Sequence, residues 1–311
     1  VLDPFWEEKG YVSPEEYSRF CNSTVPLARM EKRVFHNEEP FVAQVEVAHF
    51  GEEELLESVP GWRITNQKMD TLFHGVFDTV NISIGNNIQL GNLNVELREI
   101  SEPKQLTLSV NVHGFENDWD FWVYPKQQEE VENVQVTRML DQNAIAHLNN
   151  GGVVLWSIPD STKNKNLNDG IGFSSIFWNT AWTNGQKPHS LGILCNPNHP
   201  ALNDFPTEYH ANWQWWDAMT YSNAIILDNF PKEIQPIVRV IDDWFQNRKQ
   251  ALIIEVKVGN GKLLISGIDF FRNIENRPGG KQLLHSLKKY IDSDRFDPKV
   301  EMSVVEIKNL I

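Results

Sequence analysis

The spacing of apolar residues changes near residue 130, and this change divides the chain between two kinds of β-sheet. From Phe41 to Val47 every second residue is apolar, and the same alternation returns at residues 93–97 and 106–112. A period of two is typical of antiparallel strands that bury one face. With further strands expected at 62–65, 72–80 and 118–124, residues 35–126 predict an immunoglobulin-like antiparallel β-sandwich.

From residue 127 the pattern is that of an α/β domain. A strand at 134–137, a helix near 140–148 and a buried run at 153–156 predict a βαβ unit with parallel strands. Asn-Gly at 260–261 predicts a hairpin, and the apolar stripe after Pro278 predicts a covering helix. With a last strand expected at 300–305, residues 127–311 predict a three-layer α/β domain, flavodoxin-like or class I amidotransferase-like.

Residues 1–34 form a third segment that precedes the sandwich. Ser13-Pro14-Glu15-Glu16 matches a capping box and predicts a short helix through Phe20, followed by an extended connector. The chain begins without Met in an apolar, aromatic stretch, so we expect it to continue a longer protein.

Composition excludes several classes of partner. The net charge of -14 and the pI near 5.1 oppose binding of nucleic acid, which requires clustered basic residues. Neither an apolar run long enough to span a bilayer nor a signal peptide is present in the sequence, so no membrane partner is expected. The Gly-rich pieces at 259–261 and 279–280 do not match a phosphate-binding loop, and no cofactor is expected.

The segment from Tyr209 to Asp217 is the most distinctive in the chain. It holds three indoles within four residues, and these cannot all face one core. Contact with a sugar, packing against another domain and ordinary core packing all remain open for them. The carbohydrate or domain-interface candidates are Trp182, His210, Trp213, Trp215, Trp216 and Asp217.

Catalytic and metal sites have weaker support. Cys195 follows a buried strand with His199 nearby, but Pro197 opposes the strand-to-helix elbow that a nucleophilic cysteine requires. The set His199, Asp204, Glu208 and His210 matches no metal-binding spacing, so no metal is expected. Asp242 and Asp243 are adjacent on a strand and point to opposite faces, which excludes them as an acid and nucleophile pair.

Several motifs together resemble the C-terminal region of bacterial family 2 glycoside hydrolases, the β-galactosidase and β-glucuronidase type. These motifs are Val1 to Val12 with Ser13-Pro14-Glu15-Glu16, Asn117 to Pro125, Leu191 to Leu202 with Phe205-Pro206-Thr207, Trp213 to Asp217, and Asn276-Arg277-Pro278.

The resemblance implies a non-catalytic accessory region that follows the TIM barrel of an exo-β-glycosidase. Phe5, Trp6 and Tyr11 would contact that missing N-terminal barrel of the same chain, and an oligosaccharide or polysaccharide would be a further partner. The family's catalytic glutamates match no residue here, so no catalytic residue is expected. A periplasmic or secreted location follows from the resemblance alone.

Two rival interpretations remain. A stand-alone carbohydrate-binding module would present exposed Trp rings in a shallow groove. An amidotransferase-like or trehalose-utilisation-like enzyme would place a deep pocket near Cys195, His199 and Asp242, with shifted pKa values.

Overall fold

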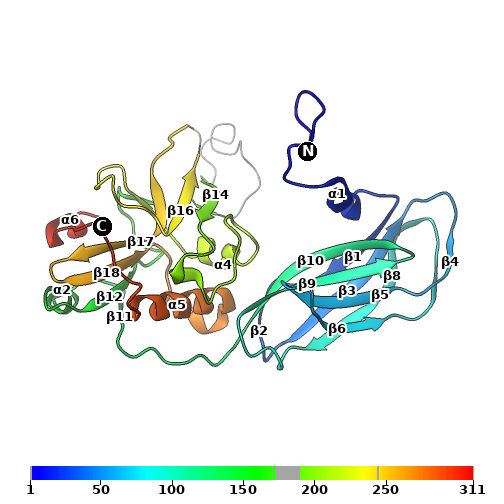
Figure 1. Cartoon of the computed structure of the whole chain (residues 1–311), viewed down its shortest axis with the longest axis horizontal. Coiled ribbons are helices and arrows are strands. Elements are labelled where there is room, and N and C mark those ends of the chain that lie inside the picture. Colours follow the sequence, from blue (N-terminus) through cyan, green and yellow to red (C-terminus); the bar gives the residue numbers. More distant parts are fainter. Residues whose placement is uncertain (1, 170, 173–189, 244, 311) are drawn as a thin grey trace. The chain divides into compact units, whose positions relative to one another are not determined.

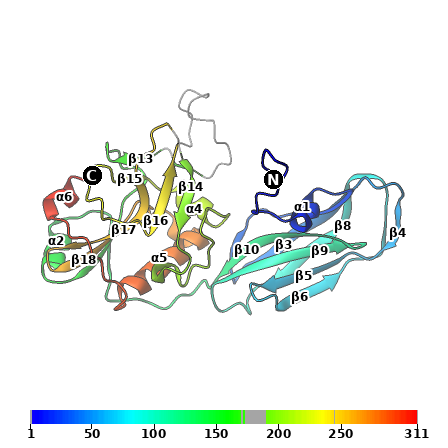
Figure 2. The same ribbon diagram turned by 45° about the horizontal axis from the view of Figure 1, so that its top comes forward.

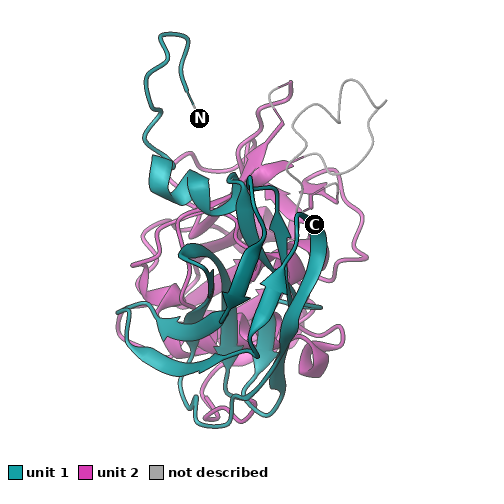
Figure 3. Cartoon of the chain, turned by 90° about the vertical axis from the view of Figure 1, so that its right-hand side faces the viewer, with its two compact units in different colours: residues 1–125 teal, residues 126–311 magenta. Residues whose placement is uncertain are grey.

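The computed structural model of the chain describes residues 2–169, 171–172, 190–243 and 245–310. These residues form mostly β-sheet with few helices. They separate into two compact units, unit 1 up to Pro125 and unit 2 from Lys126 onward, which Figure 3 colours differently.

Unit 1 consists of one short helix followed by strands. Its elements are α1 (Pro14–Phe20), β1 (Thr24–Arg29), β2 (Val34–His36), β3 (Pro40–His49), β4 (Leu55–Ser58), β5 (Gly61–Asn66), β6 (Thr71–Val76), β7 (Val80–Ile82), β8 (Gly85–Glu96), β9 (Lys104–Val112) and β10 (Phe115–Tyr124) (Figure 1). One sheet has the order β1-β3-β8 and the other β2-β10-β9-β5-β6, while β4 pairs with β7.

The two larger sheets of unit 1 share one apolar core. Alternate residues of β3, β8, β9 and β10 point into it, as the period of two predicts. Three phenylalanines join the sheets: the ring centroid of Phe41 in β3 lies 5.5 Å from Phe35 in β2 and 4.3 Å from Phe121 in β10. All three rings are buried, so this cluster connects the two layers.

Unit 2 is a mixed sheet with helices. Its elements are β11 (Gln135–Thr137), α2 (Gln142–Asn149), β12 (Val153–Ser157), β13 (Leu167–Asn168), β14 (Ser190–Cys195), η1 (Pro200–Leu202), α4 (Trp215–Thr220), β15 (Ala224–Ile226), β16 (Val238–Asp242), β17 (Gln250–Val258), β18 (Gly261–Ser266), η2 (Ile274–Asn276), α5 (Pro278–Ile291) and α6 (Val304–Lys308) (Figure 2). Strands β11, β12 and β18 are parallel, whereas β17, β16 and β14 continue the sheet in antiparallel pairs.

Helices cover both faces of this sheet. Leu148 of α2 and Ile307 of α6 share a core cluster with Val256 of β17. On the opposite face the Tyr290 hydroxyl of α5 donates a hydrogen bond of 2.7 Å to Oε2 of Glu255. The adjacent residues Glu255 and Val256 point to opposite faces, as strand geometry requires, so α5 lies across the sheet from α2 and α6.

The parallel pair around α2 and the hairpin at Asn260 are confirmed, but the strand expected at residues 300–305 is wrong. Glu301 forms a single bridge to Lys257, and helix α6 begins after Ser303. The Ser303 hydroxyl accepts a hydrogen bond from the Glu306 amide, and the Glu306 carboxylate accepts one from the Ser303 amide. This capping box satisfies two amides that would otherwise need a strand partner, which favours the helix.

Truncation of Phe121 to alanine should destabilise unit 1 by about 3–5 kcal/mol, because it opens a cavity where the two sheets meet. The matched control is Phe50→Ala, whose ring is 63% exposed and whose loss should cost about 0.5 kcal/mol or less. Hydrogen exchange followed in peptides from β3 and β10 measures the difference. Equal protection in the two variants would contradict a central role for the phenylalanine cluster.

Candidate functional site

Trp215 fixes the orientation of the tryptophan-rich segment in unit 2. Its side chain is fully buried, packs edge-to-face on Phe205 with ring centroids 5.2 Å apart, and donates from Nε1 to the Thr207 hydroxyl at 2.8 Å. The buried Gln214 side chain donates to the Pro206 carbonyl at 2.7 Å. Helix α4 is therefore held to the unit by its first turn.

This anchor leaves the neighbouring indoles on the outside. Trp213 precedes α4 and Trp216 lies in its first turn, and the Trp216 amide donates to the Trp213 carbonyl at 3.3 Å. Trp213 is 52% exposed, Trp216 50% and the nearby Tyr209 60%. We call these three residues the aromatic surface. Exposed rings of this kind mark contact with a sugar or with another protein surface.

The other candidates in this segment have different surroundings. His210 is exposed, its ring lies edge-to-face on Tyr209 at 4.8 Å, and its backbone bridges to Leu194 of β14. Asp217 points to Arg277, which is only 5% exposed and donates from Nε at 2.7 Å. Arg277 also lies 4.2 Å from the ring centroid of Tyr221 and donates to the Asp269 carbonyl. Asp217 therefore holds α4 to the start of α5. Trp182 lies outside the described residues.

The N-terminal aromatics of unit 1 are displayed by a compact turn. Oδ1 of Asp3 accepts hydrogen bonds from the amides of Phe5 at 2.8 Å and Glu7 at 2.9 Å, and the Asp3 carbonyl accepts one from the Trp6 amide. Trp6 adopts the left-handed region at φ 68°. The rings of Phe5, Trp6 and Tyr11 are 81%, 83% and 67% exposed. Figures 1 and 2 show this segment as a loop beyond α1.

We did not predict from the sequence that Asp3 would order this turn. The signal was present, because Asp-Pro is a common way to begin a turn and the Asp carboxylate readily accepts hydrogen bonds from amides two to four residues on.

Cys195 does not have the surroundings of a nucleophile. Burial, with a smaller contribution from the Glu208 carboxylate, raises the pKa of its thiol to about 11. Its Sγ donates to the Glu208 carbonyl at 3.3 Å. Burial lowers the pKa of His199, whose Nδ1 accepts from the Ala201 amide at 3.2 Å. These contacts pair the thiol and the imidazole with backbone groups.

Asp242 and Asp243 are each committed to local contacts. Asp242 forms a bidentate pair with Arg248, with Nε at 2.8 Å and Nη2 at 3.0 Å. Burial opposes ionisation of Asp242, but the hydrogen bonds from Arg248 outweigh it, and the pKa of this carboxyl is lowered overall. Asp243 accepts from the amides of Phe245 and Gln246 at 2.8 and 2.9 Å. Both carboxylates stabilise the chain after β16.

The four residues weighed as metal ligands are held by different partners. Asp204 pairs with Lys289 at 2.5 Å and Glu208 accepts from Asn212, while His199 and His210 make the contacts given above. Within the part of the chain that the structure describes, no group of three or more histidine, cysteine or acidic side chains could hold a metal ion. Among the same residues no helix is long and apolar enough to cross a bilayer.

The difference between the two cysteines can be tested by alkylation. With a pKa of about 11, only about one Cys195 thiol in a thousand is ionised near pH 8. Iodoacetamide should therefore modify the exposed Cys21 in the native protein and spare Cys195. Peptide mass spectrometry reads both sites, and a denatured sample, in which both cysteines should react, is the control. Modification of native Cys195 at the rate of Cys21 would contradict this assignment.

Comparison with known proteins gives two family matches. Residues 135–311 match "Domain of unknown function (DUF8487)", and residues 39–125 match "Domain of unknown function (DUF8488)". No curated protein sequence matches the chain.

Solved structures with partial likeness include glycosidases. A β-glucuronidase from Parabacteroides merdae is 8% identical with a TM-score of 0.24, over 43% of this chain and 21% of its own. A putative β-galactosidase from Bacteroides fragilis is 7% identical with a TM-score of 0.20, over 43% and 24%. The sporulation control protein Spo0M from Bacillus subtilis is 9% identical with a TM-score of 0.24, over 34% and 51%.

This chain thus spans about a fifth of the length of that β-glucuronidase. The match to residues 135–311 covers more than half of the 311 residues, and the chain therefore belongs to the family described as DUF8487.

Proposed function

We propose that this chain is a non-catalytic accessory region of a family 2-type exo-β-glycosidase. In this proposal residues 1–34 leave the catalytic barrel and supply strand β1 to the sandwich, residues 35–126 are the rest of an immunoglobulin-like accessory sandwich, and residues 127–311 are an amidotransferase-like α/β domain without catalytic residues. The partner is the N-terminal barrel of the same protein, and the chain itself hydrolyses no glycoside.

The display of Phe5 and Trp6 carries this proposal. Three hydrogen bonds to the side chain and carbonyl of Asp3 order the turn, so the backbone that carries the two rings has a defined conformation. A non-glycine residue at positive φ is uncommon, and Trp6 adopts this conformation while its ring is 83% exposed. An ordered turn that presents two large rings to water is suited to insertion into another apolar surface.

The side chains that a rival enzyme would use support the same conclusion. The thiol of Cys195 stays protonated because its pKa is raised, and the ionised carboxylate of Asp242 is engaged in an ion pair with Arg248. Neither group is poised for the nucleophilic or acid–base step that an amidotransferase-like enzyme would require.

The test compares the 311-residue chain with a longer protein that carries a family 2 catalytic barrel ahead of residue 1. The chain alone should not hydrolyse p-nitrophenyl β-galactoside, β-glucoside or β-glucuronide, whereas the longer protein should hydrolyse one of them. Burial of two aromatic rings contributes about 4 kcal/mol, so Phe5→Ala with Trp6→Ala should lower the melting temperature of the longer protein by about 8 °C or more. The same change in the chain alone should shift it by about 1 °C or less.

Phe50→Ala is the matched control for this experiment, because its ring is also exposed but lies on the sandwich. It should shift both proteins equally. Hydrolysis by the chain alone, or an equal shift of both proteins by the Phe5 and Trp6 changes, would overturn the proposal.

A second candidate function is glycan binding through the aromatic surface, favoured by the two half-exposed indoles beside the anchored Trp215. The apolar face of a sugar ring packs well on an indole. Affinity electrophoresis in gels that contain soluble polysaccharides tests it: retardation of the chain should be abolished in a Trp213→Ala, Trp216→Ala variant. Retardation that persists in this variant would remove the aromatic surface as the site.

A further inference from the structure

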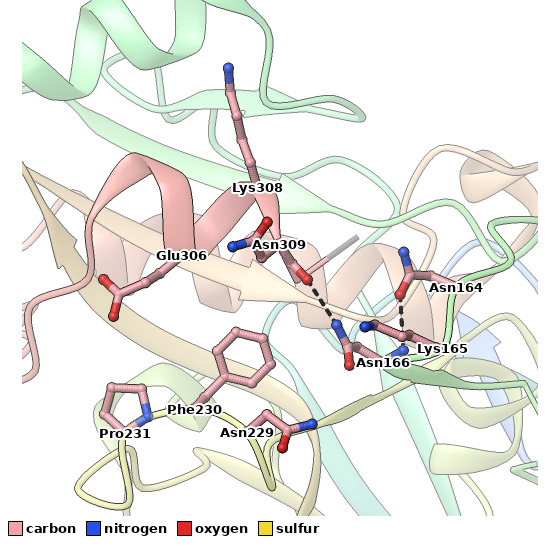
Figure 4. A pocket seen from close by; sticks show the side chains of 9 residues that line it. All are labelled: Asn164, Lys165, Asn166, Asn229, Phe230, Pro231, Glu306, Lys308 and Asn309. Carbon is pink, nitrogen blue, oxygen red and sulfur yellow. Dashed lines mark hydrogen bonds between the residues drawn. The ribbon is translucent and has the colours of Figure 1, made fainter.

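A polar pocket in unit 2 is separate from the candidate catalytic, metal-binding and aromatic residues described above. Its volume is about 790 Å³, and it opens to solvent between the loop after β12, the loop after β15 and the end of α6 (Figure 4). The residues that line it are Asn164, Lys165, Asn166, Asn229, Phe230, Pro231, Glu306, Lys308 and Asn309.

Carboxamide groups surround one aromatic ring in this pocket. Phe230 is partly buried and packs against the core cluster that β17 shares with α2 and α6, so the ring has a fixed support. Figure 4 shows the ring between Glu306 and Asn309 on one side and Asn229 on the other. Amides offer donors and acceptors together, and the ring offers an apolar platform.

Hydrogen bonds hold the wall of the pocket in place before any ligand arrives. Nδ2 of Asn166 donates to the Asn309 carbonyl at 2.8 Å, which ties the loop after β12 to the end of α6. The backbone amide of Asn166 donates to Oδ1 of Asn164 at 2.9 Å. Glu306 is engaged in the capping box with Ser303, while Asn229 lies exposed on the rim. A wall that is already ordered reduces the entropic cost of binding.

The lining narrows the chemical class of the ligand. An apolar ligand would leave the amides without partners, since Phe230 and Pro231 are the apolar residues among those that line the pocket. A metal ion would find one carboxylate there, Glu306, which is already hydrogen-bonded. Lys308 extends away from the ring, and Lys165 is the one other cation of the lining, so the pocket lacks the converging cations that a phosphate requires.

A sugar satisfies all of these features, because it combines hydroxyls that both donate and accept with an apolar face of C–H groups. We propose that this pocket binds one pyranose unit of a glycan, with its apolar face on Phe230 and its hydroxyls bonded to Asn229, Asn309 and Asn164. The volume lies within the usual range for small-molecule sites. This site shares no residue with the aromatic surface and does not depend on the accessory role, so it can be tested separately from both.

The test uses the full chain and saturation-transfer difference NMR with a panel of methyl glycosides: β-galactoside, β-glucoside, α-mannoside, β-xyloside and N-acetyl-β-glucosaminide. At least one glycoside should receive saturation, and the signal should fall about fivefold or more in Asn229→Ala and in Asn309→Ala. Both side chains are exposed, so these variants should fold. Asn143→Ala on the exposed side of α2 is the matched control and should leave the signal unchanged.

Phe230→Leu adds a second measurement, because leucine retains apolar packing on the core but removes the flat ring. The C–H protons of the sugar that receive most saturation should change in this variant. The proposal is overturned if no glycoside of the panel binds, or if binding survives all three pocket variants. Binding that is instead lost in Trp216→Ala would also overturn it and would place the sugar on the aromatic surface.

Discussion

Strand β17 is buried on both faces, and the arrangement of unit 2 follows from this constraint. Ile254, Val256 and Val258 share a core cluster with residues of α2 and α6, and Glu255 on the other face bonds to Tyr290 of α5. A strand that has no solvent-exposed face requires helices on both sides of its sheet. Polar groups within this layer must then find partners: Gln250 accepts from Asn168 at 3.2 Å, and Glu255 accepts from Tyr290. Burial raises the pKa of Glu255, although the Tyr290 hydrogen bond partly offsets this effect.

The two candidate surfaces of unit 2 arise from the same packing. Trp215 packs in the core, while Trp213, just before α4, and Trp216, in its first turn, are about half exposed. Helix α6 is drawn onto the sheet by Ile307, and its last residues then form one wall of the amide-lined pocket. In both places a buried apolar residue sets the position of exposed polar or aromatic neighbours. Binding surfaces on rigid elements lose little entropy when a ligand orders them.

Unit 1 is built differently, because alternate residues of its strands face a shared core and most of the residues between them are exposed or partly exposed, with Trp122 and Tyr124 of β10 as buried exceptions. Phe35, Phe41 and Phe121 join the layers, and the polar edges are held by pairs such as Arg29 with Glu46. The Asp3 turn lies outside this core, and its order comes from hydrogen bonds within the turn. The aromatic rings that it presents lie outside the core of the sandwich, and this is the basis of our proposal that they contact a partner surface.

The sequence by itself determined most of the local structure. Alternation predicted β3, β9 and the end of β8, whereas β1 lies in the segment expected to be a connector. Apolar runs and Gly-rich turns predicted the βαβ unit and the hairpin at Asn260, and Ser13 with Glu16 predicted α1. These features depend on neighbours along the chain, so they can be read from spacing. Only the tertiary structure decided which tryptophan is buried, that Asp217 pairs with Arg277, and that Asn166, Asn229 and Asn309 meet around Phe230. These contacts join residues from 8 to 143 positions apart, and no local pattern records them. Helix α6 combines the two kinds of information. The alternation of residues 300–305 is typical of a strand, but the capping box at Ser303 binds backbone amides that a strand would have to pair, and a helix forms.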